Sequence, residues 1–393
     1  MDLSYSPQEE LFREKVRSFL QANLPAGWGT AGYVQRTGDA QIEFLRDWQR
    51  KLYDAGMLGL EWPREYGGQG ATLIEKAIFN EEMAKFRAPF PLNIIGLINA
   101  GSTLIVHGTE AQKKRYLPKI LSCEEIWCQG FSEPGAGSDL ASLRTRAELR
   151  GDEFIVNGQK VWTSDGHIAQ MCLLLVRTDP AAPKHRGISC LMVDMKTPGI
   201  TVKPLRQMTG EAEFNEVFFE DVAVPRANLL GAVNNGWHVA VTTMTHERGT
   251  MTMAMARGFE NSFSDLIGLC RKMGPRVLHD PRRRQRLAQL YIELQCLKYT
   301  AYRDFSKILR GAAPGPEGSI SKINWEINQR ITEFALELEG PAGQLVEGSP
   351  HAVDMGRWQY EYMRARANSI EGGTSEIQRN TLAERMLGLP RSR

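Results

Sequence analysis

The chain has 393 residues, 42% of them hydrophobic, which is enough to build two or three packed layers or domains. Its 48 basic and 46 acidic residues leave a formal net charge of only +2, which excludes a general polycation that would wrap a nucleic acid backbone. The densest basic run lies at 282–286, directly after Asp280, and we expect it to be the solvated start of a helix.

The cysteines and histidines argue against disulfide and metal frameworks. The six cysteines form no C-x-x-C pair, which favours a reducing cytosol. The seven histidines show no His-Glu-x-x-His motif or other clustered ligand spacing, so we expect no metal site. Met1–Tyr5 does not begin a secretory signal, and no stretch reaches the roughly 18 apolar residues of a membrane helix. We therefore expect a soluble, cytoplasmic protein with no nucleic acid partner and no membrane insertion.

The first 122 residues have the pattern of helices separated by Gly/Pro loops. Ser6 can cap a helix whose first turn holds Pro7, and Glu9 can close a capping box with Ser6. Further helical patterns cover residues 41–55, 73–85 and 110–121. We expect an α-helical N-terminal domain at 1–122.

In the middle of the chain the spacing of apolar residues changes from a helical pattern to short strand-like runs, and we expect a β-domain at 123–235. Short β-branched or apolar runs occur at 153–156, 171–176, 188–193 and 217–219. Asn157-Gly158 is expected to form a two-residue hairpin turn, because both residue types tolerate positive φ.

Helical pattern returns from Gly236, with breaks at 311–318 and 340–343, and we expect a C-terminal helical bundle domain at 236–393. Ser375 and Gln378 are expected to form the capping box of the last helix. The order all-α, β, all-α predicts an α+β fold and gives no support to a doubly wound parallel sheet.

Two loops of the middle region could hold a ligand. Loop 130–140 combines glycines with Ser132 and Ser138, so a phosphate or a flavin edge could lie against its backbone amides. It is not G-x-G-x-x-G, because Leu140 takes the place of the last glycine, and a tight connection between domains would explain it equally well. In the second loop, Trp162 could stack on a planar cofactor while Ser164 bonds a ring nitrogen, although core packing is the simpler role for the tryptophan.

Four segments together resemble the acyl-CoA dehydrogenase family: the loops 130–139 and 157–166, the segment 369–379 and the ending 383–391. The resemblance covers nearly the whole chain. It implies an N-terminal helical domain, a middle β-domain and a C-terminal four-helix bundle. It also implies FAD between the β-domain and the C-terminal helices, an acyl-CoA substrate, and an electron-transferring flavoprotein as acceptor.

The resemblance carries site residues over by position. Those that would line the flavin are Gln129, Phe131, Ser132, Trp162 and Ser164. Ser138 would touch the CoA or acyl arm. Thr374 and Glu376 would approach the adenosine and diphosphate of FAD.

The family reaction removes a proton from the α-carbon of the thioester and a hydride from its β-carbon, so it needs a carboxylate facing the acyl chain. Gly372 occupies the slot in which many members carry this base. Other members carry it on the helix after the β-domain, where Glu247 and Arg248 match the position. Apolar neighbours would raise the pKa of such a carboxyl group and make it a better base. We expect Glu247 to be the base with Arg248 as its companion, and Glu371 is the second choice; without the resemblance, Glu247 and Arg248 would suit a solvated charge pair.

The chain departs from the family where one subunit usually completes its neighbour's flavin site. Of the arginine motif used there, this chain preserves at most Arg271, and Glu337 replaces a common glutamine. Such departures resemble bacterial members that form heteromers and act on bulky CoA thioesters, including steroid-ring fragments. We expect either a homotetramer or a heterotetramer with a paralogous subunit.

Two other functions fit the same scaffold. One is a flavin oxidase or monooxygenase, in which oxygen takes the place of the protein acceptor. The other is a non-catalytic subunit that stabilises an active paralogue.

Overall fold

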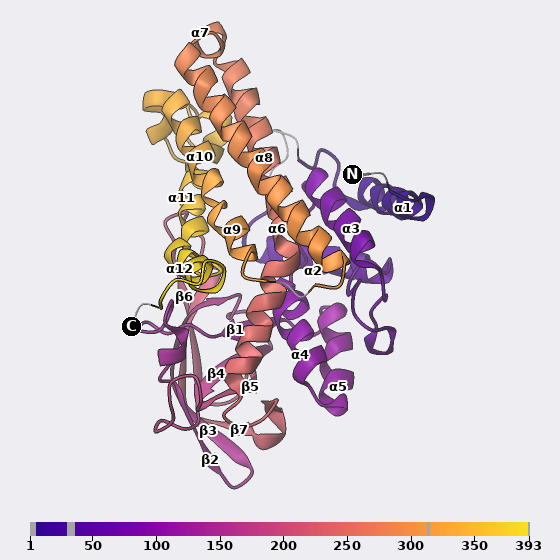
Figure 1. Cartoon of the computed structure of the whole chain (residues 1–393), viewed down its shortest axis with the longest axis vertical. Helices are drawn as coiled ribbons and strands as arrows, with labels where there is room; N and C mark the ends of the chain where they lie inside the picture. Colours follow the sequence, from indigo (N-terminus) through magenta and orange to yellow (C-terminus); the bar gives the residue numbers. More distant parts are fainter. Residues whose placement is uncertain (1–4, 30–35, 313–314, 392–393) are drawn as a thin grey trace. The chain divides into compact units, whose positions relative to one another are not determined.

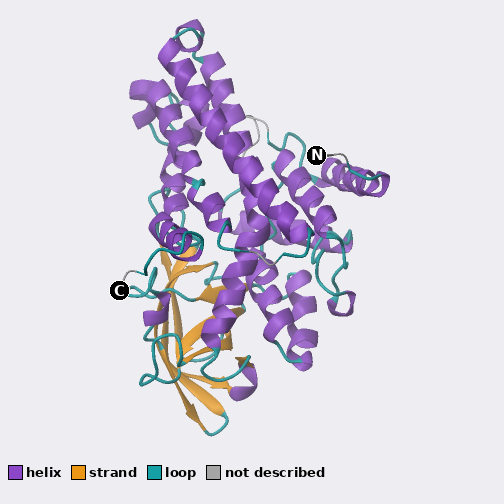
Figure 2. Ribbon diagram, in the orientation of Figure 1, coloured by secondary structure: helices purple, strands orange, loops and turns teal. Residues whose placement is uncertain are grey.

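The computed structural model describes residues 5–29, 36–312 and 315–391, and it describes their side chains except for residues 246–252. The chain forms two compact units. Met1–Tyr33, Leu73–Ala88 and Arg248–Arg393 make the first, named here the helical unit; Val34–Thr72 and Pro89–Glu247 make the second, the sheet unit (Figures 1 and 2). Helix α6 (Gly236–Lys272) begins in the sheet unit and ends in the helical unit.

Helix α1 (Pro7–Asn23) opens the helical unit with the expected capping box. The Ser6 Oγ accepts from the Glu9 amide at 3.3 Å, and the Glu9 carboxylate accepts from the Ser6 amide at 2.6 Å. Two orphan amides of the first turn are thereby satisfied. Helix α1 packs against α3 (Leu73–Lys85), whose expected bounds are confirmed.

The remaining helices of this unit follow α6 along the chain. They are α7 (Pro275–Leu278), α8 (Pro281–Leu309), α9 (Gly318–Ile323), α10 (Glu326–Glu339), α11 (Arg357–Ala365) and α12 (Ser375–Arg385). Apolar side chains of α6, α7, α8, α10 and α11 form one core that includes Leu266, Leu294, Ile331 and Trp358. The expected helix start at the basic run is confirmed, because Asp280 caps α8 by accepting from the Arg282 amide at 2.9 Å.

The expected capping box at Ser375 is wrong by one residue. Thr374 is the N-cap of α12, and its Oγ1 accepts from the amide of Ile377 at 3.2 Å. Gln378 instead donates to the carbonyl of Gly372 at 3.0 Å. Gly372 and Gly373 have φ values of 67° and 94°, a left-handed turn that brings the chain into the helix one residue early.

The sheet unit contains α2 (Gly38–Asp54), α4 (Gly101–His107) and α5 (Glu110–Leu121) beside its sheet. Among the described residues, eight strands form this sheet (Figure 2). They are β1 (Trp127–Gly130), β2 (Arg146–Arg150), β3 (Glu153–Ser164), β4 (Met171–Arg177), β5 (Ile188–Asp194), β6 (Ile200–Leu205), β7 (Phe214–Pro225) and β8 (Leu229–Leu230). The order is β6-β7-β3-β2-β4-β5-β8, with β1 parallel to β4 and most other pairs antiparallel. Strands β4 and β5 are buried along almost their whole length, as their continuous apolar runs predict.

The hairpin expected at Asn157-Gly158 is wrong, because both residues lie inside β3. The β2–β3 turn is made instead by Gly151 and Asp152, and Gly151 has a φ of 61°. At Asn157 and Gly158 the pairing of β3 with β7 shifts register, so these two residues lie in a β-bulge and not in a turn. A Cβ on Gly158 would lie 2.6 Å from the Thr145 Cα, so only glycine fits there.

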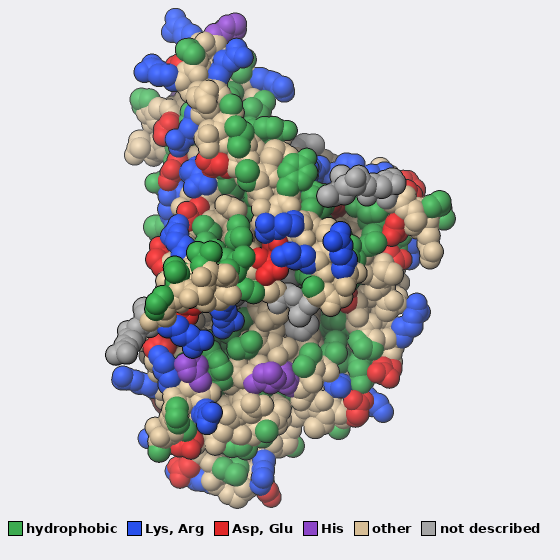
Figure 3. All heavy atoms as spheres, viewed as in Figure 1, with side chains coloured by type: hydrophobic (Ala, Val, Ile, Leu, Met, Phe, Trp, Pro, Cys, Tyr) green, Lys and Arg blue, Asp and Glu red, His purple; other side chains and the backbone are tan. Residues whose placement is uncertain are grey.

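Both basic and acidic side chains lie on the face drawn in Figure 3, among hydrophobic and polar ones. Within the described ranges, none of the helices combines the length and the apolar composition of a membrane span.

Candidate functional site

A buried ion pair fastens loop 130–140 to β3. Lys160 is fully buried, and its Nζ lies 2.9 Å from the Glu133 Oε1 and 3.0 Å from the carbonyl oxygen of Phe131. The Glu133 carboxylate also accepts from the amides of Arg144 at 2.7 Å and Thr145 at 2.8 Å. All of these bonds are charge-assisted and shielded from water, so they hold the start of the loop firmly.

Burial and charge act in opposite directions on this pair. Burial works to raise the pKa of Glu133, but the ammonium of Lys160 and the amide of Thr145 outweigh it and hold that pKa below its usual value. Burial lowers the pKa of Lys160, and the charge of Glu133 only partly offsets this. Each partner therefore keeps the other in its charged form.

Next to this anchor, the loop and the end of β3 run side by side. The Val161 amide donates to the carbonyl of Ser132 at 2.9 Å. The following residue, Trp162, has a φ of 60°, which is rare for a bulky side chain and costs about 1–3 kcal/mol. Its side chain is 59% exposed and touches Phe214 edge to face, with ring centroids 5.9 Å apart. Core packing is thus excluded as the role of Trp162.

The polar groups around Trp162 would suit a planar ligand with a hydrogen-bonding edge. The Thr163 Oγ1 is buried and has no hydrogen-bond partner among the described residues. Ser132 and Ser164 are both partly accessible, and Gln129 is oriented by the Asn99 amide, which donates to its Oε1 at 2.5 Å. An exposed indole beside several hydroxyls can stack on a ring and bond its edge.

The far end of the loop is open. Ser138 is exposed, and an added Cβ on Gly135 or Gly137 would meet no atom within 4 Å. Beyond it, Lys184 lies 2.9 Å from Asp139 in a pair that is more than half exposed. The loop is therefore rigid beside β3 and accessible at its tip.

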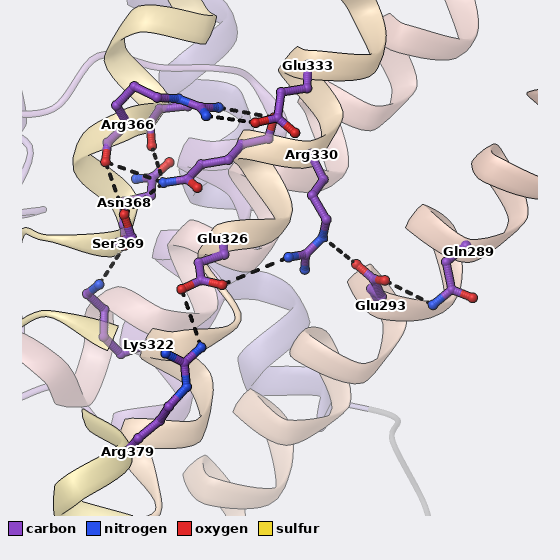
Figure 4. Close-up of polar contacts among 12 residues, drawn as sticks. Gln289, Glu293, Lys322, Glu326, Arg330, Glu333, Arg366, Asn368, Ser369 and Arg379 are labelled. Carbon is purple, nitrogen blue, oxygen red and sulfur yellow. Dashed lines mark hydrogen bonds and ion pairs between the residues drawn. The ribbon is translucent and has the colours of Figure 1, made fainter. Parts of the chain in front are cut away.

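In the helical unit, the segment before Gly372 is held by a buried side chain from α9 and a partly buried one from α10 (Figure 4). The Lys322 Nζ, from α9, donates to the Asn368 carbonyl at 2.6 Å. The amide of Gln329, from α10, donates to the Ser369 Oγ at 3.0 Å and to the Ala365 carbonyl at 3.1 Å. These bonds tie the segment to the bundle core.

Glu371 is committed to partners within its own unit. Its Oε2 lies 3.1 Å from the guanidinium of Arg364, and its Oε1 accepts from the Asn368 amide at 2.9 Å. Two such contacts restrict the carboxylate, so turning toward a substrate would weaken them. This arrangement weakens Glu371 as a candidate base.

The other predicted site residues of the helical unit lie apart from this segment or serve local roles. Thr374 uses its hydroxyl to cap α12, and Glu376 is exposed beside Arg379 at 3.4 Å. Arg271 is exposed near the end of α6, and Glu337 is exposed on α10. The side chains of Glu247 and Arg248 lie outside those that the structure describes.

Two acidic side chains near Trp162, the buried Glu133 and the partly buried Asp165, are not among the site residues predicted from the sequence. The first is Glu133, and the position of its partner Lys160 could have revealed it. Lys160 follows Phe154 and Val156 on the inward face of β3, where a lysine is unusual. The second is Asp165, whose pKa is raised to about 6 by burial and, secondarily, by the charge of Glu213. No sequence pattern signals Asp165.

No group of three or more His, Cys, Asp or Glu side chains suited to a metal ion occurs in the part of the chain that the structure describes. The side chains around Trp162 provide an aromatic face, hydroxyls and carboxylates.

Comparisons with known proteins place the chain in a family. Its residues 6–124, 128–222 and 234–387 match the acyl-CoA dehydrogenase N-terminal, middle and C-terminal domains. Acyl-CoA dehydrogenase IpdE1 of Mycobacterium tuberculosis is 39% identical over 388 residues, which cover 97% of this chain and 98% of that protein.

Two solved structures are similar over the full length of both chains. One is described as the Tcur3481-Tcur3483 steroid ACAD, with a TM-score of 0.86 and 32% identity. The other is the ChsE4-ChsE5 complex from Mycobacterium tuberculosis, with a TM-score of 0.85 and 31% identity. The expected family and the expected α+β fold are confirmed, and the chain belongs to the acyl-CoA dehydrogenases, a family of flavin-binding oxidoreductases.

Proposed function

We propose that the chain is an FAD-dependent dehydrogenase that introduces an α,β double bond into an acyl-CoA thioester. The observation that carries this proposal is the strained, exposed Trp162 beside Ser132 and the orphaned hydroxyl of Thr163, a corner suited to an isoalloxazine ring. When bound, FAD supplies the acceptor for the hydride that leaves the β-carbon. Gln129, Phe131, Ser132, Trp162 and Ser164 orient it.

The proposed base is Glu247, with Arg248 as its companion. Gly372 provides no carboxylate, and Glu371 is bonded to Arg364 and Asn368, which supports a base elsewhere. Glu247 takes the α-proton of the thioester while the β-hydride leaves from the opposite face of the acyl chain. Ser138, at the open tip of its loop, contacts the CoA or acyl arm.

The substrate is proposed to be a bulky thioester, such as one that carries a steroid-ring fragment. Support comes from the similar structure described as a steroid ACAD. We further propose that the chain assembles with a paralogous acyl-CoA dehydrogenase subunit, because that structure and the ChsE4-ChsE5 complex each name two proteins. Arg271, Thr374 and Glu376 then contribute to the FAD diphosphate and adenosine region, and an electron-transferring flavoprotein takes the electrons.

Anaerobic mixing with linear, branched and polycyclic acyl-CoAs tests the reaction and the base together. Flavin bleaching is followed for the native protein, for Glu247→Gln and for the matched control Glu371→Gln. Loss of a general base slows its step by about 10²–10⁴-fold. We expect that loss for Glu247→Gln, with bound FAD retained, and bleaching within a few-fold of native for Glu371→Gln. The reverse pattern would reassign the base to Glu371.

Two further measurements separate the other functions. Rapid oxygen consumption during turnover, without a protein acceptor, would identify an oxidase or monooxygenase. A purified chain that stays colourless after FAD addition in the absence of a partner would favour a non-catalytic subunit.

A further inference from the structure

A π-helix at Gly96–Ala100 runs directly into α4 and packs against β1 in the sheet unit. The amide of Gly101 donates to the carbonyl of Gly96, five residues back, so this turn holds one residue more than an α-helical turn. An added Cβ on Gly96 would lie 2.3 Å from the Asn93 Oδ1. An added Cβ on Gly101 would lie 2.2 Å from the indole of Trp62. Close packing on both sides therefore requires glycine at the two ends of this turn, a type that is rare and frequently found at functional sites.

The start of the π-helix is fastened to the start of β1 through Asn93, which is fully buried. The Asn93 Oδ1 accepts from the amide of Trp127 at 2.8 Å. Its Nδ2 donates to the carbonyls of Glu125 at 2.7 Å and Ile120 at 3.1 Å. All three partners are backbone groups, so the spacing between the π-helix and β1 is set by the folded chain and not by a freely rotating side chain.

Asn99 lies in the wide turn and reaches the side chain of Gln129 in β1. Asn99 is only 5% exposed, and its Nδ2 donates to the Gln129 Oε1 at 2.5 Å. Its carbonyl oxygen accepts from the Thr103 Oγ1 at 2.6 Å, and that hydroxyl lies 2.8 Å from the Thr243 Oγ1 of α6. Both threonines are fully buried. Asn99 is thus held through its backbone, while its side-chain amide holds Gln129.

The bond from Asn99 determines what Gln129 can offer to a ligand. A glutamine amide has one acceptor oxygen and two N–H donors on its nitrogen. The oxygen of Gln129 is engaged by Asn99, whereas its Nε2 has no hydrogen-bond partner among the described residues and the side chain is partly accessible. Gln129 therefore presents donors, and a ligand beside it needs an acceptor atom.

We infer that Asn99 is a positioning residue that turns the amide of Gln129 so that it donates a hydrogen bond to an acceptor atom of the bound flavin ring. This inference rests on the proposed flavin site. It adds the direction of one hydrogen bond and the residue that sets it. Gln129 lies in the strand that leads into loop 130–140, and the ring of a flavin carries acceptor oxygens and nitrogens on its edge. A ring that accepts a hydride gains negative charge, so a donor there favours the reduced form and raises the reduction potential.

Asn99→Asp tests the direction of this bond. A carboxylate only accepts, so Gln129 must turn to donate to it, which leaves the Gln129 Oε1 facing the acceptor on the ring. The affinity of the apoprotein for FAD is measured by titration, and the reduction potential of the bound flavin is measured against a reference dye. We expect the dissociation constant for FAD to rise about tenfold, because one hydrogen bond is lost and its acceptor is left unpaired. The reduction potential should fall.

A second variant and a matched control accompany this change. Gln129→Glu puts the acceptor on the other partner, since Asn99 can still donate to the new carboxylate, and it should shift the affinity and the potential in the same direction. It also tests the inference if Asn99→Asp does not fold. In the control, Asn228→Asp, the original Asn228 Nδ2 likewise donates to a carbonyl of the sheet unit, that of Met192 at 2.9 Å. This control should leave both flavin properties unchanged.

A double variant distinguishes positioning from a merely structural role. Gln129→Leu removes the donor altogether and should weaken FAD binding. If Asn99 acts through Gln129, then adding Asn99→Asp to Gln129→Leu weakens the binding no further, because residues that act through one bond are not additive. Independent effects would multiply the two fold-changes.

Three outcomes would overturn the inference. Unchanged affinity and potential in Gln129→Glu and Asn99→Asp would show that Gln129 makes no bond to the flavin. Multiplied effects in the double variant would show that Asn99 does not act through Gln129. Unchanged flavin properties together with weaker binding of an acyl-CoA, measured by titration, would place the acceptor on the thioester. The two flavin readouts need no turnover, so this inference can fail while the proposed dehydrogenation holds, and hold while that reaction fails.

Discussion

The Nζ of Lys160 lies 2.9 Å from the Glu133 Oε1, and both side chains are almost completely buried. The two residues are 27 positions apart in the chain, yet they join strand β3 to the loop that follows β1. In the same sheet unit, Lys184 and Asp139 lie at the same distance on the surface, with both side chains more than half exposed. The two pairs differ mainly in their contact with water.

Lys160→Met is expected to lower the free energy of unfolding by about 3–5 kcal/mol, because it leaves the Glu133 carboxylate buried without its counter-charge. The matched change Lys184→Met should cost less than about 1 kcal/mol, since water screens that pair. Urea unfolding of both variants measures the difference. Equal losses would contradict the view that burial makes the Lys160 pair important.

The pH dependence of the Glu133 contribution follows from the sign of its shift. The pKa of Glu133 in the folded state is below its usual value of 4.5, so the folded state binds fewer protons. Its stabilising contribution is present above pH 4.5 and is lost as pH falls through the depressed pKa. In acid titration of the native protein, we expect protonation of Glu133 to release loop 130–140, seen as faster proteolysis of that loop.

The contribution of Asp165 to stability is expected to change with pH in the opposite direction to that of Glu133. Its folded-state pKa of about 6 exceeds the ordinary 3.8, so the carboxylate costs stability above pH 6 and nothing below pH 3.8. Asp165→Asn should raise the free energy of unfolding at neutral pH by about 1–2 kcal/mol, after allowance for partial exposure. Denaturant unfolding on both sides of pH 6 checks this. A gain that does not change with pH would instead reflect the preference of asparagine for the φ of 56° at this position.

Variants of Trp162 can measure its effect on flavin binding separately from its effect on backbone strain. Trp162→Ala is expected to weaken FAD binding about tenfold, or about 1.4 kcal/mol, because a stacking face is lost. Trp162→Phe should retain most of the affinity, and Phe90→Ala, a change of another exposed aromatic residue in the sheet unit, should have no effect. Titration of each apoprotein with FAD gives the affinities.

The same position predicts a stability difference in the absence of FAD. At a φ of 60°, glycine is less strained than alanine by about 1 kcal/mol. The Trp162→Gly apoprotein should therefore be more stable than Trp162→Ala, although neither binds FAD well. If the alanine variant is the more stable of the two, the positive φ is not a source of strain.

Thr374 and Ser375 form a pair of neighbouring hydroxyls with different roles. Thr374→Ala removes the cap of α12 and is expected to cost about 1 kcal/mol. The Ser375 Oγ is buried without a hydrogen-bond partner among the described residues, so Ser375→Ala should not reduce stability. Thermal unfolding compares the two. A larger loss for Ser375→Ala would restore the cap position expected from the sequence.

Local patterns correctly predicted many elements. The bounds of α3 and α5, the capping box at Ser6 and the buried strands β4 and β5 all follow from hydrophobic period and capping residues. These signals depend on residues a few positions apart, so no knowledge of the rest of the fold is needed. The family resemblance likewise came from short segments, and the comparisons confirmed it.

Features that depend on contacts between residues far apart in the chain could not be predicted from local patterns. The bulge at Gly158 exists because β3 pairs with β7, and the burial of Lys160 is stable because Glu133 faces it. Trp162 is exposed because the chain turns with positive φ there, against the local preference of its side chain. A contact between residues far apart in the chain forms only after register and packing are set, so its chemistry is decided by the folded protein as a whole.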